Sequence, residues 1–239
     1  RGVHLARGFA AGKIGNQAST LKYYARRRRE SYPEVAAELE RLAGEVQDVL
    51  GWLDALSGDT LEEVRGGLLA AEGNAARIYW AGARLVAPPE YGWEERTGRG
   101  ATDPINALLN YGYGILYQQV QRAIVLAGLD PYAGFIHTDR PGKPSLVLDL
   151  TEEFRPVAVD RVVIGLAARG FKVVQEQDGL MTLETRRAFA KHVLDHLESQ
   201  TRYHGKRFPL RAVIQMQARA IAAYLRGDSP AYQPFAAGW

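Results

Sequence analysis

Helix-start signals followed by long runs of helical spacing recur along this chain, and they restrict its fold more than any other feature. Pro33 precedes one apolar stripe, Asp59-Thr60-Leu61-Glu62 has the form of a capping box, and Asp103-Pro104 opens another long apolar run. Such a start, followed by apolar residues three and four positions apart, is typical of an amphipathic helix. The same spacing predicts helices over 9–30, 31–50, 59–82, 103–128, 145–156, 157–170, 185–204 and 209–226. We therefore expect a predominantly all-α fold.

One short segment has the pattern of a strand pair instead. Residues 171–183 alternate weakly on both sides of Gln177-Asp178-Gly179, which predicts one small β-hairpin. The length suits one large domain, and we expect residues 1–239 to form a single α-helical catalytic domain. Residues 228–239 are rich in proline and aromatic side chains, so this tail is expected to be extended and to dock on the surface or on a partner.

Composition excludes several classes of protein. The chain is 46% hydrophobic and 24% charged, which is typical of a globular protein. It contains no cysteine, so disulfides and thiolate metal sites are excluded, and a reducing compartment such as the cytoplasm is expected. No apolar run approaches the ~20 residues that a membrane helix needs, so we expect no membrane partner. The sequence begins at Arg1 rather than Met, and we expect that this is not the native start.

Residues 134–156 carry a candidate metal site. His137 ends an apolar tripeptide, and Asp149, Glu152 and Glu153 follow in a segment that Pro144 and Ser145 can start as a helix. At positions i, i+3 and i+4 the three acids share one helix face. An imidazole facing clustered carboxylates can hold Mg²⁺ or Mn²⁺. The alternative is an ordinary acidic surface helix and a structural histidine.

Glu72 is the second unusual acid. Small residues surround it on the third predicted helix, and apolar or aromatic residues flank them. A carboxylate in such a position is partly buried, and burial without a partner is expensive. A metal, an arginine or a catalytic role would supply the partner. The alternative is a glutamate at the rim of the helix, paired with Arg65 or Arg77.

Basic residues form clusters that suit a phosphate backbone. Arg26–Arg29 form one cluster, residues 185–226 are rich in lysine and arginine, and the formal net charge is +3. Solvated helix faces are the alternative for each cluster. The residues expected to contact DNA are Arg26, Arg27, Arg28, Arg29, Arg77, Arg96, Arg99, Arg140, Lys143, Arg186, Arg187, Lys206 and Arg207.

Several of these stretches together resemble one family. The quoted motifs are Gly-Lys-Ile-x-Asn-Gln from Gly12, Glu-Gly-x-Ala-Ala-x-x-Tyr-Trp from Glu72, Asp-Pro-x-Asn-Ala-Leu-Leu-Asn-Tyr-x-Tyr from Asp103, and Gly-x-x-His with Ser-Leu-x-x-Asp-Leu-x-Glu-Glu-Phe-Arg-Pro in 134–156. In this order they are similar to the CRISPR spacer-acquisition integrases, the universal integrases of CRISPR adaptation. The resemblance covers residues 9–170 in motif form and is weaker afterwards.

The resemblance implies a metal-dependent DNA endonuclease and integrase that inserts new spacers into CRISPR arrays. It implies that Glu72, His137 and Glu152 are ligands of Mn²⁺ or Mg²⁺, with Asp149 close by as a further catalytic residue. Because Glu153 directly follows Glu152, the resemblance leaves open which of these two acids is the last ligand. It implies double-stranded and branched DNA as substrates, a homodimer, and a small CRISPR adaptation partner protein. Family members carry a β-rich domain before this point, so the chain resembles the catalytic part of a longer protein.

Other interpretations stay open at this point. The same fold can serve as a non-catalytic DNA-binding scaffold, as a mobile-element integrase acting on transposon ends, or as an unrelated helical binding protein. His192 and His196 are four positions apart and can bind a metal as a pair, but the sequence offers them no clear third ligand. We expect them to face DNA or solvent.

Overall fold

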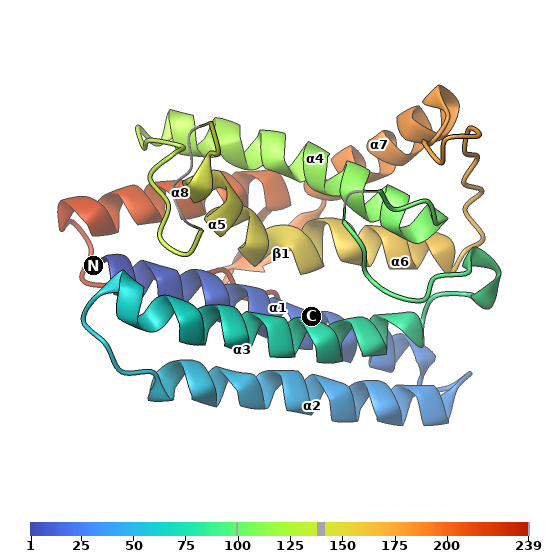
Figure 1. Ribbon diagram of the computed structural model, residues 1–239, viewed down its shortest axis with the longest axis horizontal. Coiled ribbons are helices and arrows are strands. Elements are labelled where there is room, and N and C mark those ends of the chain that lie inside the picture. Colours follow the sequence, from blue (N-terminus) through green and yellow to red (C-terminus); the bar gives the residue numbers. More distant parts are fainter. Residues whose placement is uncertain (99, 138–141, 239) are drawn as a thin grey trace.

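Long helices make up most of the protein (Figure 1). The computed structural model describes residues 1–98, 100–137 and 142–238. Its elements are α1 (Gly2–Arg28), α2 (Pro33–Ala55), α3 (Leu61–Arg84), the 3₁₀ turn η1 (Pro89–Tyr91), α4 (Pro104–Leu126), α5 (Ser145–Arg155), the π turn η2 (Pro156–Asp160), α6 (Arg161–Ala167), α7 (Leu183–Leu197), β1 (Gln200–Tyr203), β2 (Lys206–Pro209) and α8 (Leu210–Arg226). The predicted class, all-α with one small β-hairpin, is confirmed.

Helix α1 lies at the centre and is buried on most sides. Leu5, Phe9, Ile14 and Leu21 are fully buried. In Figure 1, α2 and α3 lie on one side of α1, and α5 to α6 lies between α1 and α4. The sequence pattern favoured the helix after Asp103 as the central one, but α4 leaves Val125 and Leu126 exposed, so α1 takes that place.

The helix starts follow the predicted signals closely. Thr60 accepts a hydrogen bond from the backbone of Glu63, whose carboxylate in turn accepts from the backbone of Thr60 at 3.4 Å. The capping box is therefore one residue later than the predicted Asp59–Glu62 pair. Asp103 caps α4 as expected, because its carboxylate accepts a hydrogen bond from the backbone of Asn106 at 2.9 Å.

Helices α5 and α6 form one continuous rod. The spacing predicted two separate helices over 145–156 and 157–170, and Pro156 at their boundary lacks the N–H that continues an α-helix. The π turn η2 instead spans Pro156–Asp160 and carries the backbone from α5 directly into α6. A π turn already interrupts the regular hydrogen-bond ladder, so the missing donor of Pro156 is tolerated there.

The hairpin lies at a different place from the predicted one. Residues 171–183 form only an isolated bridge between Gln175 and Met181. The paired strands are β1 and β2, in a stretch where the sequence predicted the end of a helix reaching residue 204. The turn between them places His204 and Gly205 at φ 46° and 77°. Two consecutive residues with positive φ are typical of the tight turn that fits the twist of a hairpin.

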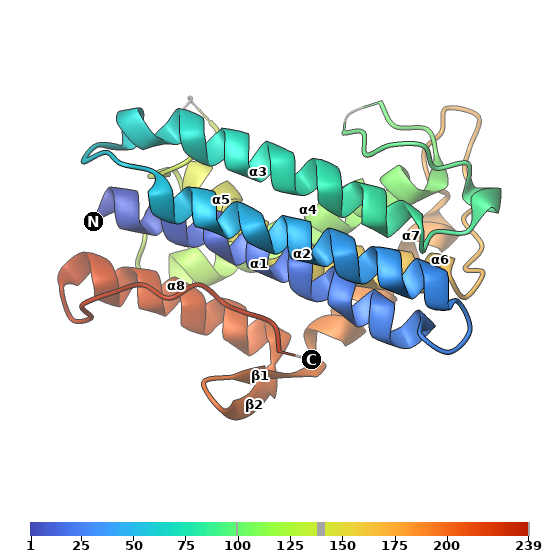
Figure 2. The ribbon, with the colours of Figure 1, turned by 90° about the horizontal axis from the view of Figure 1, so that it is seen from below.

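The C-terminal tail packs against α1 and α5. Tyr232 and Phe235 are buried, and Phe235 stacks on Phe154 with ring centroids 5.2 Å apart. Figure 2 shows the tail running along α8. The approach depends on Gly12 of α1, because a Cβ there would lie 2.7 Å from Glu153 and 2.9 Å from Pro234. Among the described residues, no helix combines the length and apolar character that crossing a membrane requires.

Candidate functional site

Two buried carboxylates from different helices converge on one lysine. Glu72 projects from α3 and Glu152 from α5, and their exposed fractions are only 6% and 4%. Lys13 of α1 places its Nζ 2.8 Å from Oε2 of Glu152 and 3.7 Å from Oε1 of Glu72. Glu152 also pairs with Arg155, one turn further along α5. Three helices that are far apart in sequence thus bring two acids and two cations together.

The protonation of this cluster follows from burial and from the two cations. Burial raises the pKa of Glu72 above its ordinary value, although Lys13 opposes the shift. Burial would also raise the pKa of Glu152, but Lys13 and Arg155 outweigh it and the pKa is lowered. The pKa of Lys13 is raised because Glu152 and Glu72 outweigh its own burial. Glu152 and Lys13 are therefore held as an ion pair at neutral pH.

His137 is held by Asp149. The Nδ1 atom of His137 lies 2.6 Å from Oδ1 of Asp149, which also accepts a hydrogen bond from the backbone N–H of His137. The other oxygen of Asp149 accepts hydrogen bonds from the backbone of Phe135 and Ile136. Asp149 is fully buried and its two oxygens are already used. It therefore acts on the ring of His137, fixing its orientation and leaving Nε2 as the ring nitrogen for a ligand.

The donor set fits a divalent cation. Oε1 of Glu72 and Oε2 of Glu152 are buried and accept no well-formed hydrogen bond within the described residues, although both contact the Lys13 ammonium. Two carboxylate oxygens and an imidazole nitrogen are ligands that Mg²⁺ and Mn²⁺ accept. Within residues 1–98, 100–137 and 142–238, no three His, Asp or Glu side chains already stand in a coordinating arrangement. The ammonium group of Lys13 lies between the two carboxylates.

The structure separates Glu153 from the candidate metal site. Its carboxylate accepts hydrogen bonds from Gln217, from the hydroxyl of Tyr232 at 2.7 Å and from the backbone of Phe235 at 2.7 Å. Burial raises the pKa of Glu153 to about 7, against the effect of these three donors. Glu153 thus serves the docking of the tail, and Glu152 is the acid of this pair that faces Glu72 and Lys13.

A cavity opens beside the carboxylates. It has a volume of about 270 Å³ and is lined by residues that include Lys13, Trp80, Tyr113 and Glu152. The guanidinium groups of Arg96 and Arg155 stack on the ring of Tyr113, with their central carbons 5.3 and 4.5 Å from its centroid. A second cavity, of about 560 Å³, shares Arg96, Tyr113 and Arg155 with the first. The two adjoining cavities form a cationic recess next to the acids.

Two asparagines of α4 fix the loop that carries Arg96. Oδ1 of Asn106 accepts hydrogen bonds from Arg96 and from the backbone of Thr97, both at 3.0 Å. Oδ1 of Asn110 accepts another from Arg96 at 2.6 Å. These bonds hold the described part of the loop between η1 and α4 against α4. Arg96 is therefore presented to the recess by neighbouring side chains.

A buried aspartate supports the floor of the cavity. Asp160 accepts hydrogen bonds from the hydroxyls of Tyr79 at 3.0 Å and Tyr113 at 2.5 Å. Burial raises the pKa of Asp160 to about 6. This arrangement fixes Tyr113, the ring on which Arg96 and Arg155 stack.

The other residues expected to contact DNA are spread over the molecule. Arg26, Arg27, Arg29, Arg77, Arg186, Arg187, Lys206 and Arg207 are exposed, and Arg28 and Lys143 are partly exposed. Arg29 pairs with Glu40, and Arg77 bonds to Asn74. Arg99 and Arg140 lie outside the described residues. Of the described members of this set, the structure brings Arg96 and Arg186 into the recess.

Sequence reasoning missed the partner of Glu72. The sequence offered Arg65 or Arg77, whereas the partner is Lys13, which comes from α1. The signal was a lone lysine within an otherwise apolar stretch of that helix. His192 and His196 also have individual contacts: His196 Nε2 donates to the carbonyl oxygen of Val157 at 2.9 Å, and His192 meets the ring of Phe171.

Comparisons with known proteins agree on one family. Residues 1–195 match the model of the family described as CRISPR associated protein Cas1. A CRISPR-associated endonuclease Cas1 of Archaeoglobus fulgidus is 38% identical over 100% of this chain and 72% of its own length. One from Thermus thermophilus is 36% identical over 98% of this chain and 69% of its own length.

Solved structures show the same fold. A casposase bound to integration product superposes with a TM-score of 0.82 at 26% identity, over 97% of this chain and 66% of that one. A Cas6-RT-Cas1--Cas2 complex contains a chain that matches with a TM-score of 0.79 at 22% identity, over 99% of this chain and 25% of its own length. The chain therefore belongs to the CRISPR-associated Cas1 family.

Proposed function

We propose that this chain is the catalytic part of a divalent-metal-dependent DNA endonuclease and integrase that inserts new spacers into CRISPR arrays. Relatives named as Cas1 endonucleases support the nuclease activity. The observation that carries the proposal is the convergence of Glu72 and Glu152 on one partly buried cation, Lys13. Two buried acids held close together are costly to keep, so their presence supports a functional use.

Each residue of the site has a role in this proposal. Glu72, Glu152 and Nε2 of His137 would hold Mn²⁺ or Mg²⁺, and Asp149 orients the imidazole. The bound ion would polarise a phosphodiester and stabilise the charge that develops on its oxygens. Arg96 and Arg155 line the recess, where they neutralise the phosphate of the strand. The 3′-hydroxyl of the incoming DNA attacks phosphorus, so that one phosphodiester bond forms as another breaks; in nuclease action water attacks instead.

Partners follow from the same proposal. The exposed basic residues on α1, α7 and the hairpin would hold double-stranded or branched DNA through its backbone. A homodimer joined to a small CRISPR adaptation protein is the assembly we propose, in line with the solved Cas6-RT-Cas1--Cas2 complex. The cytoplasm is the compartment in which this activity is proposed.

The test is cleavage and strand transfer with Mn²⁺ on branched and linear DNA. We expect Glu72→Gln, Glu152→Gln and His137→Ala to lower the rate by roughly 100-fold or more, because each removes a ligand of the ion that would act on the reacting phosphate. Glu62→Gln is the matched control, since Glu62 is an exposed glutamate of the same helix as Glu72. Full activity in the Glu72 and His137 variants would refute the site. Wild-type protein that binds DNA but never cleaves it would identify a DNA-binding scaffold.

A mobile-element integrase is the second candidate function. The similarity to the casposase bound to integration product favours it. The two candidates share the site and differ in the DNA that they join. Strand transfer into a CRISPR repeat, compared with transfer of transposon-end DNA, separates them.

A further inference from the structure

A buried glutamine lies one helical turn beyond the lysine of the candidate metal site. Gln17 follows Lys13 by four residues on α1, which is ~6 Å along the helix axis. Its exposed fraction is only 3%, and it lines the cavity of about 270 Å³ that Lys13 and Glu152 also line. Gln17 therefore borders the space in which the proposed reaction takes place.

The fold does not use the amide oxygen of Gln17. Its Oε1 atom is buried and accepts no hydrogen bond from the described residues. The preceding residue, Asn16, is buried as well, yet its Nδ2 donates to the carbonyl oxygens of Glu153 and Phe235 and its Oδ1 accepts from the backbone of Ala237. Burying a polar atom without a partner is costly, so an acceptor that the fold leaves unused indicates a functional use.

The carboxylates of the same cavity are committed to partners, and its cations can only donate. Glu152 is paired with Lys13 and Arg155, and Asp160 accepts hydrogen bonds from two tyrosine hydroxyls. The lysine and arginine side chains of the lining suit the oxygens of a phosphate, because those oxygens only accept. The oxygen of Gln17 suits a group that donates.

A hydroxyl is the donor that the proposed reaction brings to this cavity. We propose that Oε1 of Gln17 accepts a hydrogen bond from the attacking 3′-hydroxyl, or from the attacking water in nuclease action, and so positions the nucleophile beside the phosphate. This inference rests on the proposed function and assigns one further residue to it.

Gln17 orients the nucleophile and does not act as a base. The hydroxyl oxygen forms a bond to phosphorus as the P–O bond to the leaving 3′-oxygen breaks, and the released proton passes through solvent to that leaving oxygen. The amide stays neutral throughout this exchange. Its contribution is the alignment of the two reacting atoms, which is a large part of the barrier in phosphoryl transfer.

The first experiment compares the affinities for two DNA ends that differ by one hydroxyl. A duplex with a 3′-hydroxyl end and the same duplex with a 2′,3′-dideoxy end are titrated in Ca²⁺ and in EDTA, so that no turnover is needed. We expect the wild type to bind the hydroxyl end about 3–10-fold more tightly, which is the contribution of one hydrogen bond. Gln17→Met has a similar length but no amide and should lose this preference, whereas Gln17→Glu keeps an acceptor at the same reach and should retain it.

The second experiment measures single-turnover strand transfer with Mn²⁺. We expect Gln17→Met to lower the rate of the chemical step by about 10-fold or more, because the nucleophile loses its alignment. Its affinity for the dideoxy end should equal that of the wild type. Gln47→Met is the matched control, since Gln47 is an exposed glutamine of α2 that bonds to Lys22, and it should react as the wild type does.

Thermal denaturation separates this role from a structural one. Gln17→Met removes an acceptor that the fold does not use, so the thermal midpoint should stay unchanged or rise. Gln217 of α8 is also buried, but its amide bonds to Glu153, Gln233 and Tyr203. Gln217→Met should therefore lower the midpoint by about 4 °C or more. Equal losses in the two variants would make Gln17 a structural residue and overturn the inference.

The affinity measurement keeps this inference apart from the proposed function. A wild type that prefers the hydroxyl end but never cleaves DNA would support the position of Gln17 and contradict the endonuclease proposal. The inference is overturned if the wild type binds both ends equally or binds neither, or if Gln17→Met keeps the preference. A preference that follows the identity of the terminal base instead of its hydroxyl would overturn it as well.

Discussion

At the scale of single residues, Lys13 governs how the two acids of the site coexist. Glu72 and Glu152 are both buried, and two carboxylates held close together repel unless a cation lies between them. The Lys13 ammonium supplies that cation in this structure. A divalent ion that uses the same two oxygens must displace it. Lys13 therefore stabilises the arrangement of the two acids, and it would compete with the proposed metal for their oxygens.

We expect Lys13→Met to destabilise the metal-free protein by on the order of 3 kcal/mol, because it leaves buried charge without its partner. Mn²⁺ should restore more stability to this variant than it adds to the wild type, since the competing ammonium is gone. Urea denaturation with and without Mn²⁺ measures both effects. Lys22→Met is the control, because Lys22 is an exposed lysine of the same helix. An equal gain from Mn²⁺ in wild type and Lys13→Met would contradict the assignment of the ion to these oxygens.

The sequence predicted the acids better than their surroundings. The small neighbours of Glu72 correctly indicated a buried carboxylate, because they leave room for close packing around it. Helical spacing predicted that Asp149, Glu152 and Glu153 share one face. The hydrogen bond from the hydroxyl of Tyr232 shows that Glu153 faces the tail instead. The roles of Lys13 and Asp160 depend on contacts between segments that are distant in the sequence. Helical spacing gives no information on such contacts. The metal and DNA roles of these residues stay predictions.

At the scale of elements, helices were predictable and the hairpin was not. Helix caps and apolar stripes depend on residues that are close together in the sequence. For this reason α2, α3 and α4 begin within two residues of their predicted starts. Residues 171–183 had alternation and a turn, but the structure has only the bridge between Gln175 and Met181 there, and the backbone N–H of Val174 donates to the hydroxyl of Thr185. The true hairpin was indicated by Gly205 between Tyr203 and Phe208, but the preceding helical spacing concealed it. The predicted boundary between residues 156 and 157 is absent, because the π turn η2 accommodates Pro156 and continues into α6.

Gly205 allows a direct test of that hairpin turn. Its φ is 77°, and a Cβ built there would meet no atom within 4 Å, so only the backbone conformation opposes a side chain. We expect Gly205→Ala to lower the free energy of unfolding by about 1 kcal/mol. Gly44→Ala, in the middle of α2 and equally open, should raise it by about 0.5–1 kcal/mol. Thermal denaturation of both variants measures the contrast, and changes of the same sign would refute the turn geometry.

At the scale of the whole molecule, the two ends of the chain meet across the core. His4 Nε2 lies 3.1 Å from both the amide nitrogen and the carbonyl oxygen of Tyr232. Asn16 donates to the carbonyl oxygens of Glu153 and Phe235, both at 2.9 Å. The tail thereby joins α1 to α5. Sequence patterns indicated a docking tail but contained nothing that identified its partner helices.

Tyr232→Phe tests this connection with little change in shape. It removes the hydroxyl that donates to Glu153 and leaves a buried carboxylate oxygen without that partner. We expect a loss of roughly 1–3 kcal/mol in the free energy of unfolding. Tyr132→Phe removes a hydroxyl from a ring that is 51% exposed and should change stability by less than about 0.5 kcal/mol. Chemical denaturation compares the two, and equal losses would show that the tail bond contributes nothing specific.

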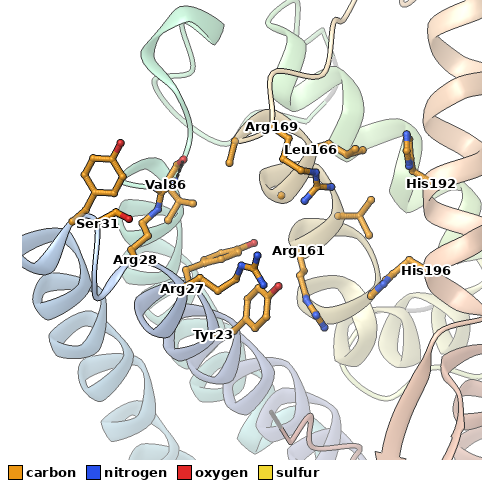
Figure 3. A pocket seen from close by; sticks show the side chains of 15 residues that line it. Tyr23, Arg27, Arg28, Ser31, Val86, Arg161, Leu166, Arg169, His192 and His196 are labelled. Carbon is orange, nitrogen blue, oxygen red and sulfur yellow. Dashed lines mark hydrogen bonds between the residues drawn. The ribbon is translucent and has the colours of Figure 1, made fainter.

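The continuous rod of α5, η2 and α6 joins two regions that the sequence keeps nine residues apart. Glu152 lies near the C-terminal end of α5, beside Lys13, and Arg161 lies at the start of α6, with its guanidinium over the ring of Tyr23 (Figure 3). Because the helical backbone continues through η2 without a loop, a displacement of α6 would be passed on to the part of α5 that carries Glu152. The π turn at Pro156 therefore links the position of Glu152 to the packing of α6.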